Sequence, residues 1–316
     1  MKTVFLDYDT VSNGDLDTAA LREAAGQLIL YDSSESKIAE RLQDADTALL
    51  NKVQLTRELL FGAPRLKLIA LAATGTNNID LIAARERGIA VCNVRAYCTA
   101  SVVQQVWGLI LNLTQHVDKF SRLSKDGTWA KDEAGTALRY PIRELNGRIF
   151  GVVGWGELGR GAARVAETFG MKVVIANRPG EPPEPGRLHL DDLLAAADIV
   201  SLHCPLTPAT RGLIGARELK LMKPDALLIN TARGALVDSA ALAAALKAGK
   251  LGGAGVDVLP QEPPVDGDPL LDGAIPNLLV TPHIAWAARE ARQRCIDEMA
   301  ANIRDFRAGG RRGRVV

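Results

Sequence analysis

The chain has 316 residues, more than one typical hydrophobic core accommodates, so two domains are predicted. A formal net charge of +1 argues against a nucleic-acid partner and an anionic membrane surface, because both attract strongly basic proteins. The four cysteines, Cys92, Cys98, Cys204 and Cys295, show neither a C-x-x-C pair nor metal-ligand spacing. We therefore expect no metal site, and free thiols in a reducing cytosol.

Short apolar runs alternate with helical patterns over the first part of the chain. Strands are predicted at TVFLDY, LILY, TALLN and LKLIALAAT, with helices such as LDTAALREAAG and SESKIAERLQDA between them. This alternation predicts βαβ units and a parallel sheet. Residues 99–125 are then predicted as one long helix. Its polar residues make it a core helix rather than a membrane span, namely Gln104, Gln105, Asn112 and Gln115.

A second alternating set follows a polar segment at 124–141. Its predicted strands are RIFGVVGW, KVVIAN, DIVSLH, ALLINTA, GAGVDV and NLLVTP, and its helices include LGRGAARVAETFG and SAALAAALKAG. This order is typical of a doubly wound dinucleotide-binding domain. The last predicted helix, at 288–306, follows the final strand, and we expect it to return to the first domain.

A glycine fingerprint opens this second set. Gly154, Gly156 and Gly159 in VVGWGELG have G-x-G-x-x-G spacing between a predicted strand and a predicted helix. The first glycine permits a tight turn, the second lets a pyrophosphate approach the backbone, and the third lets the helix pack on the sheet. The helix N-terminus also attracts the anion. The motif predicts a dinucleotide cofactor.

The strand after the fingerprint ends without the acid that usually accepts from the ribose hydroxyls. Asn177 and Arg178 stand there instead. Asn177 can hydrogen-bond a ribose hydroxyl. Arg178 can pair with a 2′-phosphate, although a solvated surface arginine is the alternative. The predicted cofactor is therefore NADP or NAD, with NADP acceptance favoured by these two residues.

Four polar residues follow the later strands of the second set. Arg233 and Asp257 each come just after an apolar run, as does His283 in TPHIAW, while Glu262 lies in PQEPP. The carboxyl ends of parallel strands border the ligand crevice, where a guanidinium can fork onto a carboxylate or a carbonyl oxygen. A histidine is the natural proton donor near neutral pH, and a carboxylate beside it favours the imidazolium. His116, His189 and His203 are expected to have non-catalytic roles.

Several segments, read together, resemble the D-2-hydroxyacid dehydrogenase family over essentially the whole chain. They are GWGELGR, HCPLTPATRGLI, LMKPDALLINTARGALVD, GAGVDVLPQEPP and TPHIAWAAREARQR. The likeness is greatest to the bacterial glycerate dehydrogenase, or hydroxypyruvate reductase, branch. The resemblance implies reduction of hydroxypyruvate or glyoxylate with a nicotinamide cofactor.

The family pattern implies a role for each matching residue. Arg233 would hold the substrate, His283 would be the general acid and base, and Glu262 would orient His283. Asp257 would contact the nicotinamide carboxamide or its surroundings, and Thr210 would lie near the pyrophosphate. The cofactor set implied is Gly154, Gly156, Glu157, Leu158, Gly159, Asn177, Arg178, Cys204, Pro205, Thr210, Thr231, Ala232, Arg233, Asp257, His283 and Ala285. The substrate set implied is Asn51, Lys52, Thr74, Gly75, Arg233 and His283, with backbone N–H groups near Thr74 and Gly75 receiving the carboxylate.

The implied fold is two Rossmann-like, doubly wound α/β lobes with an active-site cleft between them. Residues 1–98 plus 287–316 would form a flavodoxin-like substrate lobe, and 99–286 the dinucleotide-binding lobe. The family also implies a homodimer built largely through the second lobe. The chain departs from the pattern at the missing acid, at Ala285 in place of glycine, and at Gln105, where histidine is common.

Three alternatives stay open at this point. Phosphoglycerate dehydrogenase has the same core. A formate-type dehydrogenase is disfavoured because that branch has a Gln–His pair where this chain has Glu262 and His283. A nucleotide-sensing, corepressor-like binding protein would use the same scaffold without catalysis, but all three catalytic residue types are present.

Overall fold

The computed structural model describes residues 1–33, 37–136, 138–179, 181–182 and 184–316. It consists of two compact units, Met1–Cys98 with Trp286–Val316 (unit 1) and Thr99–Ala285 (unit 2). The predicted division placed residue 286 in the second lobe. That position is corrected, because Trp286 packs against a core cluster of unit 1.

Unit 1 is built on a five-stranded parallel sheet with the order β2-β1-β3-β4-β5. Its strands are β1 (Lys2–Phe5), β2 (Gln27–Leu30), β3 (Thr47–Leu50), β4 (Leu68–Leu71) and β5 (Ala90–Cys92). This is the flavodoxin-like order. Strand β5 was not among the predicted strands, because a run of three residues shows no periodicity from which to recognise it.

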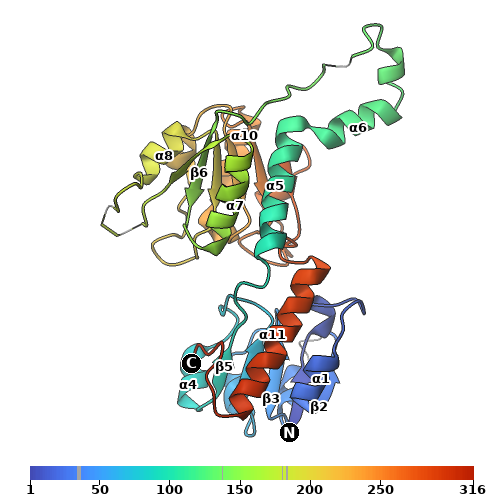
Figure 1. Ribbon diagram of the computed structural model, residues 1–316, viewed down its shortest axis with the longest axis vertical. Helices are drawn as coiled ribbons and strands as arrows, with labels where there is room; N and C mark the ends of the chain where they lie inside the picture. The colour runs from blue at the N-terminus through green and yellow to red at the C-terminus, as the bar shows by residue number, and fades with distance from the viewer. Residues whose placement is uncertain (34–36, 137, 180, 183) are drawn as a thin grey trace. The chain divides into compact units, whose positions relative to one another are not determined.

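The helices of unit 1 cover this sheet and include the last helix of the chain. They are α1 (Ala19–Ala25), α2 (Ile38–Leu42), α3 (Arg57–Phe61), α4 (Leu81–Glu86) and α11 (Arg289–Arg307). Helix α11 lies beside α1 (Figure 1), and its residues Ile296, Met299 and Ile303 are buried in one cluster with Phe5 and Leu21. The predicted return of the last helix to the first domain is therefore confirmed. The predicted helix SESKIAERLQDA lies partly outside the described residues.

Unit 2 is built on a six-stranded parallel sheet with the order β11-β10-β9-β8-β6-β7. The strands are β6 (Ile149–Val153), β7 (Lys172–Ile175), β8 (Ile199–Leu202), β9 (Leu227–Asn230), β10 (Gly253–Val256) and β11 (Leu278–Val280). A parallel bridge from Ala176 to Leu188 adds a further connection at the β7 edge. The chain passes from β6 to β7 on one side and then crosses to β8 on the other side of β6. The strand order therefore reverses between β6 and β8, which is where such a sheet opens its ligand crevice. The predicted fold class, two doubly wound parallel α/β lobes, is confirmed.

The helices of unit 2 are α5 (Thr99–Gln115), α6 (Val117–Lys125), α7 (Glu157–Thr168), α8 (Leu190–Ala196), α9 (Ala216–Leu221) and α10 (Ser239–Lys247). The prediction of one helix over 99–125 is wrong, because His116 is left-handed with φ 49° and separates α5 from α6. A left-handed residue cannot continue the helical hydrogen-bond pattern. The His116 ring is buried, with its centroid 5.7 Å from that of Tyr140. Among the described residues, no helix is both long and apolar enough to cross a bilayer.

Candidate active site

The glycine fingerprint forms the turn between β6 and α7. Gly154 has φ 103°, and a Cβ there would lie 2.5 Å from the backbone nitrogen of Cys204. A Cβ on Gly159 would lie 2.1 Å from the Gly154 carbonyl oxygen, so the helix packs directly on the turn. At Gly156, the N-cap of α7, no atom lies within 4 Å of the Cβ position. The open space and the unpaired N–H groups of the first helical turn fit a pyrophosphate.

Two buried polar atoms without a partner lie at the same end of the sheet, at the carboxyl ends of its strands. They are the hydroxyl of Thr231, just after β9, and Nδ1 of His203, just after β8, among the described side chains. Burial lowers the pKa of His203 to about 4, and its Nε2 lies 2.9 Å from the Ser201 hydroxyl. Nδ1 of His203 and the Thr231 hydroxyl can each form a hydrogen bond with a polar ligand. Their position fits the nicotinamide dinucleotide implied by the fingerprint.

The residues at the end of β7 have protein partners. The side-chain amide of Asn177 donates to the carbonyls of Glu181 and Pro182 at 3.1 and 3.3 Å. Arg178 lies 3.4 Å from the carboxylate of Glu184 and keeps 68% of its side chain exposed. Asn177 therefore shapes the loop that follows, while the guanidinium of Arg178 is accessible to a phosphate.

Arg233 stands in a tight turn after β9. The buried side chain of Asn230 shapes this turn, because its amide donates to the Arg233 carbonyl at 2.9 Å and its oxygen accepts from Ala232 N–H at 3.1 Å. A Cβ on Gly234 would lie 2.0 Å from the carbonyl carbon of Leu259. The glycine thus brings the Arg233 turn against the segment that leads to Glu262. The Arg233 side chain is half-buried.

Glu262 and His283 form a direct pair. Nδ1 of His283 lies 2.5 Å from Oε2 of Glu262, while Oε1 of the same carboxylate accepts from Leu259 N–H at 2.9 Å. The side chain of His283 is 27% exposed and that of Glu262 is 31% exposed, so the pair is accessible from solvent. Because the carboxylate is anchored by the backbone, it fixes the orientation of the imidazole, as in an acid–base pair.

The turn that carries His283 is held by Asp257. This carboxylate is fully buried and accepts from Ile284 N–H at 3.0 Å, Ala285 N–H at 2.8 Å and the Thr281 hydroxyl at 2.5 Å. His283 itself has φ 54°, a conformation that needs support from its surroundings. The expectation for Asp257 was a contact at or around the nicotinamide. Its buried, saturated carboxylate favours a positioning role for the His283 turn.

Helix α5 supports the same turn with two side chains one helical turn apart. The Ser101 hydroxyl donates to the Ala285 carbonyl at 2.6 Å, and the Gln105 amide donates to the Thr281 hydroxyl at 3.2 Å. Gln105, noted as a departure from the family pattern, is therefore part of a hydrogen-bonded chain to Asp257. The sequence could not show this, because residues 105 and 281 are far apart in the chain.

The remaining residues of the cofactor set lie around the same strand ends. Glu157 accepts a hydrogen bond from Thr99, and Leu158 is half-buried on α7. Thr210 closes its own turn, since its hydroxyl accepts from Thr207 N–H and donates to the Pro205 carbonyl, both at 2.7 Å. Cys204 is buried, as is Ala285, while Pro205 is exposed and Ala232 is half-buried.

The predicted substrate residues outside unit 2 follow β3 and β4 of unit 1. Asn51 is buried, and its amide donates to the Thr10 hydroxyl at 3.1 Å, whereas Lys52 is exposed. The Thr74 hydroxyl donates to the Val94 carbonyl at 2.8 Å. Within the described part of the chain, the backbone N–H groups of Thr74 and Gly75 have no acceptor. Those two N–H groups are available to an anion.

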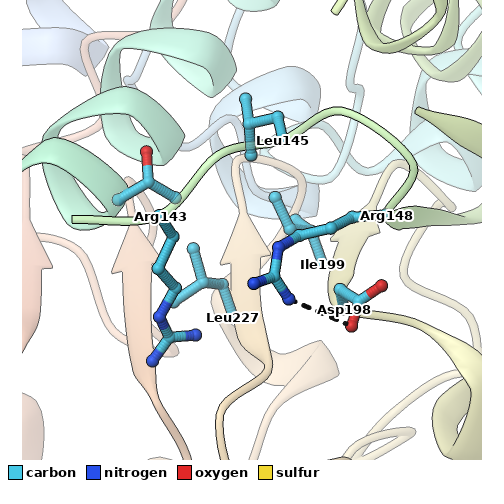
Figure 2. A pocket seen from close by; sticks show the side chains of 7 residues that line it. Arg143, Leu145, Arg148, Asp198, Ile199 and Leu227 are labelled. Carbon is cyan, nitrogen blue, oxygen red and sulfur yellow. Dashed lines mark ion pairs between the residues drawn. The ribbon is translucent and has the colours of Figure 1, made fainter. Parts of the chain in front are cut away.

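A small hollow in unit 2 lies away from these residues. It is lined by Thr114, Arg143, Leu145, Arg148, Asp198, Ile199 and Leu227 (Figure 2). Arg148 and Asp198 form an ion pair of 3.6 Å beside the amino ends of β8 and β9. Ligands of doubly wound sheets bind at the carboxyl ends of the strands, so this hollow is not the candidate site.

Comparison with known proteins gives consistent matches. Residues 107–285 match the model of the D-isomer specific 2-hydroxyacid dehydrogenase NAD-binding domain. A glycerate dehydrogenase of Methylorubrum extorquens is 43% identical over 312 residues, covering 98% of this chain and 96% of the relative. A hydroxypyruvate reductase of Blautia hydrogenotrophica is 35% identical over 317 residues, covering 98% of each chain. The solved structure of an acyclic imino acid reductase with NADPH and D-Arg matches with a TM-score of 0.84 at 26% identity, covering 100% of both chains.

The doubly wound sheet, the glycine turn and the Glu262–His283 pair define an oxidoreductase that uses a nicotinamide dinucleotide. The chain belongs to the D-isomer-specific 2-hydroxyacid dehydrogenase family. The predicted family, enzyme class and NAD(P) cofactor are confirmed.

Proposed function

We propose that this enzyme reduces hydroxypyruvate and glyoxylate to the corresponding D-2-hydroxy acids. The observation that carries the proposal is the anchored Glu262–His283 pair beside the Arg233 turn. The similarity to a glycerate dehydrogenase and a hydroxypyruvate reductase over nearly the whole chain supports this substrate class.

In the proposed mechanism, the guanidinium of Arg233 forks onto the carboxylate and the carbonyl oxygen of the keto acid. His283 donates a proton to the carbonyl oxygen as it becomes an alkoxide, and it takes the proton back in the oxidation direction. Glu262 holds Nδ1, which directs Nε2 to the substrate and stabilises the imidazolium. A bound nicotinamide supplies or accepts the hydride. The backbone N–H groups of Thr74 and Gly75 bind polar groups of the substrate.

Hydroxypyruvate is expected to be a better substrate than pyruvate or phenylpyruvate. The proposed substrate groups are polar, and a site that hydrogen-bonds a substrate hydroxyl rejects analogues without it, because its own groups lose their partners. The measurement is kcat/KM for hydroxypyruvate, glyoxylate, pyruvate, phenylpyruvate and phosphorylated hydroxypyruvate at one pH and saturating cofactor. Preference for pyruvate or phenylpyruvate would refute the substrate assignment, and preference for the phosphorylated acid would identify a phosphoglycerate dehydrogenase.

We also propose that NADPH is accepted at least as well as NADH. Residues 176–178, directly after β7, include no acid that would repel a 2′-phosphate, and the exposed Arg178 there is paired with Glu184. Because exposed ion pairs contribute roughly 0–1 kcal/mol, Arg178→Gln should weaken NADPH binding by at most about fivefold and leave NADH unchanged. Glu184→Gln, which removes the competing carboxylate, should strengthen NADPH binding. The measurement is a titration of both reduced cofactors; a hundredfold preference of the wild type for NADH would contradict the proposal.

A homodimer built through unit 2 is the proposed assembly. Figure 1 shows α6 extending away from the sheet of unit 2. In α6 and the chain after it, Val117 is 60% exposed, Trp129 53%, Leu138 81% and Ile142 54%. Apolar side chains exposed in one segment indicate a protein contact. We expect light scattering to give twice the 33.8 kDa of one chain. Leu138→Lys should weaken the dimer, while Ile82→Lys, at an exposed apolar site of unit 1, should not; the reverse pattern would contradict this interface.

We place the enzyme in the cytoplasm. The structure describes all four cysteines, and none of them forms a disulfide, as is typical of reducing compartments. Cys92, Cys204 and Cys295 are buried and Cys98 is half-buried.

A further inference from the structure

His116 and Tyr140 lie at the two ends of one excursion of the chain in unit 2. We call the described residues between them the arm; it begins with α6, which extends away from the sheet in Figure 1. The His116 ring centroid lies 5.7 Å from that of Tyr140, and the imidazole donates a hydrogen bond to the Pro141 carbonyl. His116 therefore joins the chain that enters the arm to the chain that leaves it.

The backbone of His116 sets the direction in which the arm begins. Its N–H donates to the Asn112 carbonyl at 2.7 Å in α5, and its carbonyl accepts from Phe120 N–H at 3.0 Å in α6. The Phe120 ring stands edge-on to Tyr140, with centroids 5.4 Å apart, and Nζ of Lys119 lies 5.1 Å from the Tyr140 centroid. The rings of His116, Phe120 and Tyr140 thus form one cluster, which we call the base of the arm.

The surroundings of His116 disfavour a charge on its ring. Only 7% of the residue is exposed, and burial is the largest cause that lowers the pKa of His116 below its ordinary value of 6.5. The cations of Lys119 and Arg143 lower this pKa further, while Asp118 and the Pro141 carbonyl oppose them. The neutral imidazole is therefore the form that fits the base of the arm.

We propose that His116 is a pH-sensitive closure of the arm, whose protonation separates its ring from Tyr140 and loosens α6. An imidazolium in the base would lose hydration and lie beside two cations, whereas an opened base returns it to water. Since the closed base lowers the pKa of His116, the closure is most stable above pH 6.5 and is lost progressively as the pH falls below that value.

The test is hydrogen exchange of the α6 amides in the full-length wild type, at about pH 7.5 and about pH 5.5, with rates corrected for intrinsic exchange. Protection of Val117–Lys125 should fall at least about threefold at the lower pH, and by no more than about tenfold per pH unit, the limit for one titrating group. Protection that is unchanged between the two pH values would overturn the proposal.

His116→Asn removes the titrating ring and keeps the backbone, because asparagine tolerates the left-handed conformation. Protection of α6 in this variant should be lower than in the wild type at pH 7.5 and should not fall further in acid. The matched control is His189→Asn, at an exposed histidine of the same unit, which should keep the wild-type response. A wild-type response in His116→Asn would show that another group senses the pH.

Lys119→Gln tests the same closure with His116 in place, including the case in which His116→Asn does not fold. Without this cation the pKa of His116 is lowered less, so the loss of α6 protection between the two pH values should shrink. An undiminished loss would overturn the proposal, because a purely structural role of His116 does not depend on a neighbouring charge.

The proposed dimer provides a separate readout. The arm carries exposed apolar side chains of the proposed interface, so light scattering should show a weaker dimer at the lower pH in the wild type and not in His116→Asn. This last expectation rests on the proposed assembly. Loss of α6 protection with an unchanged dimer would support the closure and contradict the interface, so the two proposals fail separately.

Discussion

His283→Ala is expected to lower kcat by about 10²–10⁴-fold, because positioned proton transfer contributes an effect of that size. The imidazole is held by Glu262 at 2.5 Å and its turn by Asp257, so its orientation is set before the substrate arrives. Cofactor affinity should stay near the wild-type value, because the glycine turn at the start of α7 is not altered. Steady-state kinetics with the keto acid and a fluorescence titration of the reduced cofactor measure the two quantities.

Two further variants test this assignment. His189→Ala removes an exposed histidine at the N-cap of α8 and should leave kcat unchanged. Glu262→Gln should give an intermediate loss, since it keeps the hydrogen bond but not the charge. A wild-type kcat in His283→Ala would show that another group transfers the proton.

Arg233→Lys is expected to reduce kcat/KM for keto acids by about tenfold or more, because hydrogen bonds to charged groups contribute about 1.5–3 kcal/mol each. Lysine keeps the positive charge but cannot form the planar, two-point fork. Asn230 and the close packing at Gly234 fix the backbone of this turn, so a shorter reach by lysine cannot be corrected by local movement. Both kcat and KM should be measured with the same keto acid.

The matched control for Arg233 is Arg148→Lys. Arg148 lies at the amino ends of the strands, opposite to the end where Arg233 lies, and pairs there with Asp198. It should leave kcat/KM unchanged. An unchanged kcat/KM in Arg233→Lys would instead assign Arg233 a structural role.

Much of the fold could be predicted from the sequence because parallel strands buried on both faces are continuous apolar runs. Strands such as Leu227–Asn230 stand out for this reason, and the glycine spacing marks where the cofactor turn begins. The break at His116 could not be predicted, since no glycine or proline marks it and the ring contact of His116 with Tyr140 joins residues that are far apart in the chain. The three-residue strand Ala90–Cys92 depends on pairing with β4, which no local pattern reveals.

The candidate site divides in the same way. Arg233 and His283 could be proposed because each follows a strand and carries a distinctive chemistry, and Glu262 because it is a carboxylate between them in the chain. The positioning roles of Asn230 and Gln105 could not be predicted. Asn230 acts on the backbone of its own turn, and Gln105 acts through a hydrogen bond to Thr281, which is far away in the chain. The periodicity of apolar residues predicts which side chains are buried. It does not predict which turn a buried amide or carboxylate stabilises.

The measurement that tests the central claim most directly is the reduction of hydroxypyruvate by the wild-type enzyme, followed by the loss of NADPH and NADH absorbance and by chiral analysis of the product. The proposed site predicts rapid turnover with at least one cofactor and a product that is D-glycerate. Absence of turnover with both cofactors, or formation of L-glycerate, would contradict it.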